Sequence, residues 1–440
     1  MVSRRRFLGY SLAGIVTAAS GCRPPDFDQK SNQTLTDLNP LLIGKEQLAE
    51  KKHLFLGYPV NMNTPPIEFF SWRDQLRKVG IGNFAYNNVG NPYAHGAIEF
   101  NTHDLEKELI VKFGKNYGFS PNNTWGFLSH SGTDSNMHGM YMGRTILQSR
   151  TMEKPICYFT KEAHYSIQIL ADLLGMKRVF VDVLEDASMD PNDLKYKLSQ
   201  NPNHPALVVA TIGTTFKGAI DKVIRIQEVL KNHESYVHLD AALFGGYLPH
   251  TRGAYHVAHN RKDSLIGSRY DSIAISCHKF FGFPSPAGLY ITTQSNFNEF
   301  NEQYSRIHNP EYIGHVPGTI TCSRDAVKPA EFYFFSSSLA MSKQAKDAQN
   351  VLKHTSELMD QLQTHFLSLE PVRSSSLSNT IFFKRPGNQI VNKYSLATMH
   401  FEQNGMIQDF AHVVIMPHVT SDVLSEFLND LDQDDTNKLG

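Results

Sequence analysis

Between about Pro121 and Thr293, short apolar runs alternate with amphipathic stretches, and this alternation restricts the fold of the chain more than any other feature. The apolar runs have the length of buried strands, and the stretches between them carry apolar residues at helical spacing. The expected strands are 125–129, 155–159, 178–182, 206–211, 236–240, 272–276 and 288–292, and the expected helices are 134–147, 165–174 and 220–232. Because near-continuous apolar strands that alternate with helices are typical of a sheet covered on both faces, we expect an α/β fold.

After about Ala330 the pattern changes. A long helical pattern runs to Leu362, and strand-like segments follow at 380–383 and 412–416. This change predicts a smaller C-terminal α+β domain. The predicted organisation is an N-terminal segment at 51–110, a large domain at 111–315 and a small domain at 316–440.

The first 22 residues have the pattern of an export signal. Three arginines at 4–6 precede Phe7 and Leu8, and an uncharged stretch follows to Ser20. A basic start, a short apolar run and small residues at its end are typical of such signals, and the arginine pair followed by Phe-Leu resembles the twin-arginine type. We therefore expect an exported protein.

Ala19-Ser-Gly-Cys22 resembles a lipobox, in which Cys22 would be acylated and become the mature N-terminus. The alternative is an ordinary cleavage site with Cys22 as an incidental thiol. Residues 23–50 are polar and contain Pro24, Pro25 and Pro40, which predicts a tether. The expected location is a membrane-anchored lipoprotein or a periplasmic or other extracytoplasmic protein.

The composition narrows the class of protein. Lys and Arg number 42 against 43 Asp and Glu, which argues against a nucleic-acid binder that works by neutralising phosphates. No apolar run reaches the roughly 18 residues of a membrane span, so contact with a membrane is expected only through the lipid anchor. Four cysteines are too few for a disulfide framework in a chain of 440 residues. A large globular enzyme fits these observations best.

Three polar motifs follow predicted strands, and the carboxyl ends of strands are where α/β sheets bind ligands. The first is Ser129-His-Ser-Gly-Thr-Asp-Ser-Asn136, between a strand and a helix. Its small residues let backbone N–H groups approach an anion at a helix N-terminus. The alternative is a simple capped helix with Thr133 or Asp134 as the N-cap.

The second motif, Val237-His-Leu-Asp240-Ala-Ala242, ends an apolar strand with a carboxylate. A buried carboxylate needs a cationic partner, and a protonated pyridine nitrogen would suit it. An ion pair or metal ligation with His238 is the alternative, because His238 and Asp240 share a strand face. We expect no metal, since no further ligands occur at a recognisable spacing.

The third motif, Ser276-Cys-His-Lys279-Phe-Phe-Gly282, places a lysine directly after a strand. Aromatic neighbours favour a lowered lysine pKa, which Schiff-base chemistry requires. The alternative is a lysine whose head reaches solvent. A phosphate loop, an aspartate and a Ser-x-His-Lys in this order are the arrangement of pyridoxal-phosphate (PLP) enzymes.

The resemblance extends well beyond these motifs. Matching stretches lie at 53–59, 84–92, 160–166, 212–219, 312–314 and 414–420. Over about residues 50–430 the chain resembles the group II PLP-dependent amino-acid decarboxylases, in particular the bacterial histidine decarboxylase and plant serine decarboxylase branch. This resemblance implies PLP fold type I, like aspartate aminotransferase, and a homodimer with active sites at its interface.

The resemblance also implies the cofactor-binding residues. Lys279 would hold PLP as a Schiff base, and Asp240 would keep the ring nitrogen protonated. His164 and Ala242 would contact the two faces of the ring, although His164 alone could equally be a surface histidine. The remaining cofactor contacts are expected from Ser131, Gly132, Thr133, Ser276 and His278 at the phosphate and from Thr214, or its neighbour Thr215, near the ring.

The expected reaction is decarboxylation of an L-amino acid, with histidine favoured over serine or another amino acid. Tyr312 is the expected proton donor, with loop packing as its alternative. Tyr58 and Asn88 are expected to line the substrate pocket, with structural roles as their alternative. A surface lipoprotein that has lost catalysis is the rival of a different class, and the presence of both Lys279 and Asp240 argues against it.

The chain departs from the family pattern at several positions, among them Ser131 and Ser135, which stand where glycine is usual in the phosphate loop. Asp134 stands where glutamate is usual, and Cys277 and Cys322 stand where glycine is usual. We expect Asp134 to make different contacts and Cys277 to crowd the backbone beside the phosphate.

Overall fold

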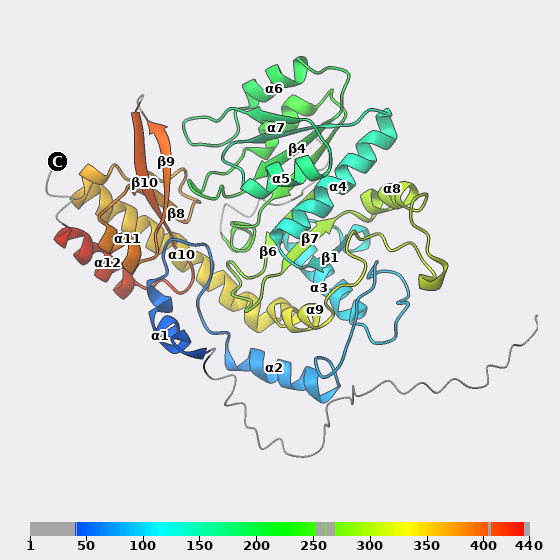
Figure 1. Cartoon of the computed structure of the whole chain (residues 1–440), viewed down its shortest axis with the longest axis horizontal. Coiled ribbons are helices and arrows are strands. Elements are labelled where there is room, and N and C mark those ends of the chain that lie inside the picture. Colours follow the sequence, from blue (N-terminus) through cyan, green and yellow to red (C-terminus); the bar gives the residue numbers. More distant parts are fainter. Residues whose placement is uncertain (1–39, 41, 252–259, 261–268, 404–405, 435–440) are drawn as a thin grey trace, which may run out of the picture. The chain divides into compact units, whose positions relative to one another are not determined.

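The computed structural model describes residues 40, 42–251, 260, 269–403 and 406–434 (Figure 1). The chain divides into two units, 1–50 and 51–440. In the described part of the first unit, helix α1 (Lys45–Glu50) has no buried residue. The expected export signal, the lipobox with Cys22 and most of the expected tether lie outside the described residues.

The second unit is built around a seven-stranded sheet in the order β1-β7-β6-β5-β4-β2-β3. The strands are β1 (Trp125–Ser129), β2 (Ile156–Thr160), β3 (Arg178–Val181), β4 (Ala206–Thr211), β5 (Ser235–Asp240), β6 (Ser272–Ser276) and β7 (Gly288–Thr292). Strands β3, β2, β4, β5 and β6 are parallel, and β7 is antiparallel to both of its neighbours. The expected mostly parallel sheet is confirmed, and each expected strand is present within one residue at either end.

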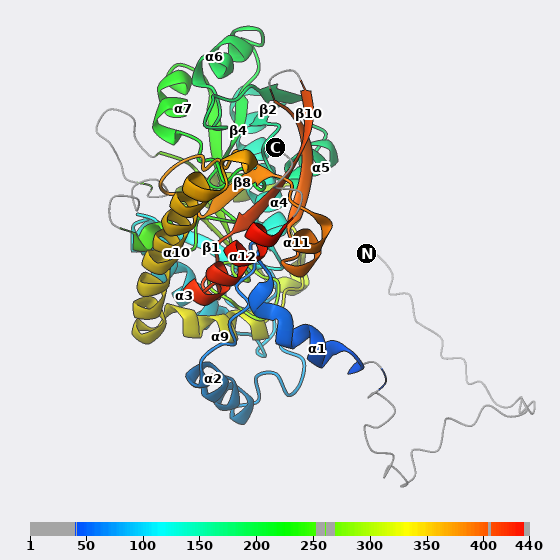
Figure 2. The ribbon, with the colours of Figure 1, turned by 90° about the vertical axis from the view of Figure 1, so that its left-hand side faces the viewer.

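Helices cover both faces of this sheet, because successive strand residues point to opposite sides. In β4, Val208 and Ala210 enter one core, and Leu207 and Val209 enter the other. Figure 2 shows α7 on one side of β4 and α5 on the other. The helices of this unit up to the small sheet are α2 (Ile67–Lys78), α3 (His103–Asn116), α4 (Gly132–Thr151), α5 (Tyr165–Leu173), α6 (Pro191–Ser199), α7 (Val223–Leu230), α8 (Gln294–Tyr304), α9 (Val327–Phe332) and α10 (Ser338–His365).

The C-terminal residues form a three-stranded antiparallel sheet in the order β8-β10-β9. Its strands are β8 (Thr380–Lys384), β9 (Ala397–Gln403) and β10 (Met406–Val414), and α11 (Asn388–Lys393) and α12 (Ser421–Gln433) accompany it. One core contains residues of α10, α11 and α12 together with Ile381, Phe383 and Val413 from the strands. The smaller α+β region is therefore present, and the expected strand at 412–416 is the end of the longer β10.

Two expected boundaries need correction. The predicted end of the N-terminal segment at residue 110 falls inside α3, whose Leu109, Ile110 and Phe113 are buried in the core of the large sheet. The expected helix at 330–362 is broken at Ser337, whose side chain accepts a hydrogen bond from the N–H of Ala340 and so caps a new helix, α10. None of the helices in the described ranges combines the length and the apolar character that a membrane crossing needs.

Candidate active site

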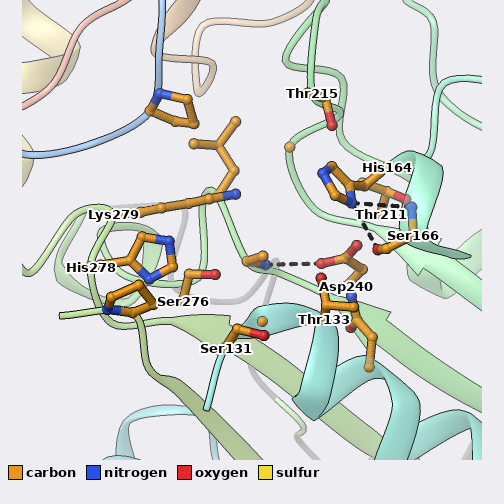
Figure 3. A pocket seen from close by; sticks show the side chains of 17 residues that line it. Ser131, Thr133, His164, Ser166, Thr211, Thr215, Asp240, Ser276, His278 and Lys279 are labelled. Atoms are coloured by element: carbon orange, nitrogen blue, oxygen red, sulfur yellow. Dashed lines mark hydrogen bonds between the residues drawn. The ribbon is translucent and has the colours of Figure 1, made fainter. Parts of the chain in front are cut away.

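A pocket opens at the carboxyl ends of β4, β5 and β6, where an α/β sheet of this kind binds ligands. Figure 3 shows Lys279, Asp240 and His164 directed into one cavity. The residues that line it are Pro59, Ser131, Gly132, Thr133, Asn136, His164, Ser166, Thr211, Gly213, Thr215, Asp240, Ala242, Leu243, Ser276, His278, Lys279 and Pro286. The three sequence motifs therefore meet in one place.

The loop before α4 is shaped to bind an anion. Ser131 is the N-cap of α4, and its hydroxyl accepts a hydrogen bond from the N–H of Asp134 at 3.2 Å. A Cβ added at Gly132 would lie 2.5 Å from Ser276 Oγ, so only glycine allows this close approach. The N–H groups and the dipole at the start of this 20-residue helix favour a phosphate. The N-cap is thus Ser131, and neither Thr133 nor Asp134 takes that position.

The family departure at Asp134 has a clear structural role. Its Oδ2 accepts a hydrogen bond from the N–H of His130 at 2.9 Å, while its own N–H binds Ser131. Asp134 therefore fixes the loop on the side away from the pocket, and it is absent from the pocket lining.

Asp240 and Lys279 face the cavity with few partners. Asp240 ends β5, is only 3% exposed, and accepts one hydrogen bond within the described chain, from the N–H of Ala242 at 3.2 Å. No described residue forms a hydrogen bond or ion pair with Lys279 Nζ. Burial lowers the pKa of Lys279, and the charge of Asp240 opposes this effect. A lysine with a lowered pKa supplies the free amine that a nucleophile needs.

His164 is the N-cap of α5 and lines the same pocket. Its Nδ1 accepts a hydrogen bond from the N–H of Ser166 at 3.3 Å and lies 2.7 Å from Ser166 Oγ. Because Nδ1 accepts, the network assigns the ring proton to Nε2. Burial lowers the pKa of His164, Asp240 opposes this effect, and Lys279 adds to it. The lowered pKa and the hydrogen bond accepted by Nδ1 both favour the neutral ring.

Two predicted contacts are corrected by the geometry. Thr214 is fully buried, and its hydroxyl accepts a hydrogen bond from the N–H of Ala219 at 2.9 Å, so it holds a turn and does not face the cavity. Thr215 and Thr211 line the pocket in its place. The sequence could not separate two adjacent threonines, because their orientation depends on the turn that begins at Gly213, where φ is +100°.

Asn88 is also corrected, because it lies outside the pocket. Its Nδ2 donates to Thr102 Oγ1 at 3.1 Å and to Glu106 Oε2 at 3.0 Å, and its side chain has no exposed surface. Tyr58 is 47% exposed and stacks on Phe55, while its neighbour Pro59 lines the cavity. The expected substrate contact of Tyr58 stays a prediction.

Tyr312 lies in a short 3-10 turn, Glu311–Ile313, and is 88% exposed. It does not line the pocket of its own chain. Its role as proton donor therefore stays a prediction that depends on a second copy or a movement of this loop.

Neither of the two cysteines that depart from the family pattern lines the cavity. Cys277 is buried in the hydrophobic core, so the expected crowding beside the phosphate site is wrong. Cys322 is exposed. His238, weighed above as a metal ligand, donates from Nε2 to Asn136 Oδ1 at 2.9 Å, and its Nδ1 forms a hydrogen bond with Ser272 Oγ at 2.8 Å. Within the described ranges, no group of three or more His, Cys, Asp or Glu is arranged to hold a metal.

The residues present fit PLP. The cradle at Gly132 suits a phosphate, and His278 Nδ1 is buried with no partner in the described chain, which leaves it available to a ligand oxygen. Asp240 lies opposite the lysine with oxygen lone pairs free for a protonated ring nitrogen. The site is also lined by residues to which the sequence analysis assigned no role: Asn136, Ser166, Thr211, Leu243 and Pro286. Asn136 lies in the first polar motif, Ser166 lies in the matching stretch 160–166, and Thr211 ends β4, so the sequence carried a signal for these three.

Comparisons with known proteins agree with this geometry. Residues 134–372 match the pyridoxal-dependent decarboxylase conserved domain. Histidine decarboxylase from Solanum lycopersicum is 30% identical over 92% of this chain and 91% of its own length, and serine decarboxylase 1 from Oryza sativa subsp. japonica is 29% identical over 94% and 80%. The crystal structure of L-methionine decarboxylase from Streptomyces sp.590 superposes with a TM-score of 0.76 at 20% identity, covering 94% of this chain and 98% of that one.

Proposed function

Because this chain belongs to the family of pyridoxal-dependent decarboxylases and is thus a PLP-dependent carboxy-lyase acting on an amino acid, we propose that its substrate is L-histidine and its product histamine. The supporting observation is the length of the match. The tomato histidine decarboxylase pairs 91% of its length with 92% of this chain, whereas serine decarboxylase 1 pairs 80% of its length. Histidine decarboxylase from Pseudomonas fluorescens is a further relative, at 28% identity over 76% of this chain.

The pocket residues take the following proposed roles. When bound, PLP supplies a ring that accepts the electron pair left behind as CO2 departs. Lys279 holds the cofactor through its amine, and Asp240 keeps a proton on the ring nitrogen by charge. The N–H groups after Ser131 bind the phosphate together with Ser276 and His278.

His164 and Ala242 are proposed to hold the ring between them. His164 is fixed by Ser166, so its neutral ring presents one face to the cavity without a competing charge. Tyr312, in its exposed loop, is proposed to protonate the product carbon. This role rests on the family resemblance of the sequence alone.

The test is an assay of CO2 release with each of the common amino acids on the purified, PLP-loaded protein. We expect the highest kcat/KM with histidine and histamine as the product. A higher kcat/KM with serine would replace histidine by serine in the proposal. A protein that shows no visible cofactor absorbance and no product from any amino acid would support the catalytically inactive alternative.

We also propose a homodimer. Helix α5 presents Tyr165, Ile169 and Leu173 on one face, and these side chains are 69%, 58% and 67% exposed. Four-residue spacing places them in one apolar stripe directly after His164, and a second copy would cover it. Light scattering should give twice the chain mass, and the double variant Ile169→Glu, Leu173→Glu should give the single mass. A single mass for the unaltered protein would contradict the proposal.

Export with lipid attachment is a separate proposal, which the twin-arginine pattern and the lipobox support. Labelling with a radioactive fatty acid should mark the wild type and leave Cys22→Ser unlabelled. Replacing Arg4 and Arg5 together by lysine should keep the protein inside the cell. A Cys22→Ser variant that still carries label would show that Cys22 is not the attachment site.

A further inference from the structure

A segment far from Lys279 in sequence forms hydrogen bonds with the backbone of Lys279 and Phe280. Residues 55–63, here called the strap, run past the turn that follows β6. The backbone N–H of Asn61 donates to the carbonyl oxygen of Lys279 at 3.2 Å, and its side-chain Nδ2 donates to the carbonyl oxygen of Phe280 at 2.9 Å. Asn61 therefore holds two consecutive carbonyl groups of the turn.

The turn is shaped to receive this amide. Gly282 has a φ of +71°, and a Cβ added there would lie 2.9 Å from Asn61 Nδ2. The N–H of Gly282 also donates to the carbonyl oxygen of Lys279 at 3.2 Å, and the N–H of Asn63 donates to Asn61 Oδ1 at 3.0 Å. The Asn61 amide thus uses both its donor and its acceptor, which fixes its orientation.

The other side of the strap is held by the small C-terminal sheet. The N–H of Val414 donates to the carbonyl of Leu56 at 2.8 Å, and His412 Nε2 donates to the carbonyl of Gly57 at 2.9 Å. The N–H of Met62 donates to His418 Nδ1 at 3.2 Å. Because the strap is bound at both ends of its length, Asn61 is a rigid support and not a mobile contact.

We propose that Asn61 is a positioning residue that sets where Lys279 Nζ stands in the pocket, by holding the backbone of Lys279 and Phe280 from behind. Lys279 Nζ has no hydrogen bond or ion pair with any described residue, so its place in the cavity depends on its backbone. Asn61 does not line the cavity, whereas its neighbour Pro59 does. The proposal rests on PLP-dependent decarboxylation and not on histidine as the substrate.

A small displacement of the lysine has a large kinetic effect. A misplacement of about 1 Å costs about a hundredfold in rate when reacting groups are held by their scaffold. Asn61→Asp keeps the shape of the side chain and turns the donor to Phe280 into a carboxylate oxygen, which repels that carbonyl. Asn61→Ser removes the side-chain contact and leaves the backbone contact to Lys279 in place.

The experiment compares these two variants with Asn63→Ala as PLP-loaded proteins. Asn63 belongs to the same strap, and only its backbone N–H contacts Asn61. The first readout is the pH midpoint of the visible absorbance of the bound cofactor. The second is the fraction of chains with PLP trapped on Lys279 by borohydride, measured by mass spectrometry. Neither readout requires the substrate to be known.

We expect Asn61→Asp to shift the absorbance midpoint and to lower the fraction of chains with PLP trapped on Lys279. With the amino acid that the CO2 assay identifies, kcat should fall about ten- to a hundredfold with a much smaller change in KM. Asn61→Ser should show the same change at smaller size, and Asn63→Ala should match the wild type. The proposal is overturned if both Asn61 variants keep the wild-type midpoint and trapping, or if Asn63→Ala changes equally. It is also overturned if both Asn61 variants lose their fold, because Asn61 would then be required for folding alone.

Discussion

Two pairs of opposite charge in the described part of the chain, one in the core and one lining the pocket, differ in how far their hydrogen-bonding capacity is used. Arg324 and Glu106 form a salt bridge in which both side chains are at most 1% exposed. Lys279 and Asp240 lie in the pocket without a salt bridge between them, and Asp240 accepts a single hydrogen bond from a described residue. The first pair uses nearly all of its hydrogen-bonding atoms, since only Arg324 Nε lacks a partner in the described chain, and the second pair uses few of them.

The first pair has many partners besides the salt bridge itself. Arg324 donates twice to Glu106 and once to the carbonyl of Gly90, and its guanidinium lies 5.0 Å from the centre of the Phe127 ring. Glu106 accepts further hydrogen bonds from Asn88 Nδ2 and from the N–H of Leu128. A buried charge is costly unless its partners are complete, so this cluster joins the N-terminal segment to β1 as a structural unit.

This difference in hydrogen bonding indicates that Arg324 and Glu106 stabilise the fold, whereas Lys279 and Asp240 are available to act on a ligand. Charged groups with incomplete partners inside a cleft are candidates for function. For Lys279 and Asp240 we propose that the cofactor is the missing partner. The comparison therefore predicts that substitutions in the pocket remove activity while the fold survives, and that substitutions at Arg324 and Glu106 do the reverse.

The largest effect is expected for Lys279→Ala. Loss of a group on which a whole reaction depends costs on the order of 10⁴- to 10⁶-fold in kcat. Removal of a half-buried amine without a hydrogen bond to any described residue should leave the melting temperature of the protein without cofactor equal to that of the wild type or higher. Absorbance spectra and thermal melts check this. A variant that loses activity because it is unfolded would break the comparison.

A somewhat smaller effect is expected for Asp240→Asn. The amide keeps the shape of the carboxyl group but removes the charge that favours a protonated ring nitrogen, so kcat should fall on the order of 10²- to 10³-fold, as when one electrostatic stabiliser is removed. PLP should still be trapped on Lys279 by borohydride. An Asp240→Asn variant with wild-type kcat would contradict the role of this charge.

Arg324→Met tests the other side of the comparison. It leaves Glu106 charged and buried without its main partner, which costs about 3–5 kcal/mol in the free energy of unfolding. Urea unfolding measures this loss, and the double variant Arg324→Met, Glu106→Gln should recover part of it because the unpaired charge is gone. In the folded fraction, kcat per bound PLP should stay near that of the wild type.

The smallest effect on stability is expected at His138. This residue tests whether the lack of a hydrogen-bond partner is by itself enough to identify a functional residue. Both ring nitrogens of His138 are without a partner in the described chain, but the ring lies among Trp125, Phe127 and Tyr290, outside the pocket. Burial lowers the pKa of His138 to about 3, and the charges of Arg324 and His238 add to this.

The direction of the pH dependence follows from that shift. Between about pH 6.5 and 3 the unfolded chain binds a proton at this position and the folded chain does not, so stability falls as the pH falls, by up to about 1.4 kcal/mol per pH unit. His138→Phe should remove about 1–2 kcal/mol of the loss measured between pH 7 and pH 5 by urea unfolding, with kcat unchanged. His365→Phe, an exposed position in α10, is the control and should follow the wild type.

Much of the large sheet and of the pocket could be predicted from the sequence, because both depend on residues that are close together in the chain. The apolar runs identify the strands of the large sheet. Asp240 ends β5 and Lys279 lies shortly after the end of β6, so their meeting at one sheet edge needs only parallel topology. The loop at Ser131 is likewise encoded by small residues before a helix. The domain boundary at 110 failed because the position of α3 against β1 is a tertiary contact that no local pattern shows.

The same reason explains the site residues that were missed or misplaced. Asn88 was expected at the substrate, but it packs against Glu106, and only the folded chain brings Arg324 to that cluster. Thr214 and Thr215 differ only in which way a turn points them. Asn61 lies 218 residues from Lys279, and no spacing rule connects the two.

The long sequence separation between the strap and the segments it contacts also determines when the active site forms during folding. The strap joins Gly57 to His412 across 355 positions of the chain, and contacts between such distant segments form late in folding because loop closure must precede them. The loop at Ser131 can form with its own helix, but the wall behind Lys279 closes only when both ends of the chain are in place. During refolding with PLP present, cofactor absorbance should therefore return after the far-ultraviolet circular dichroism, so that loading with cofactor reports a finished fold.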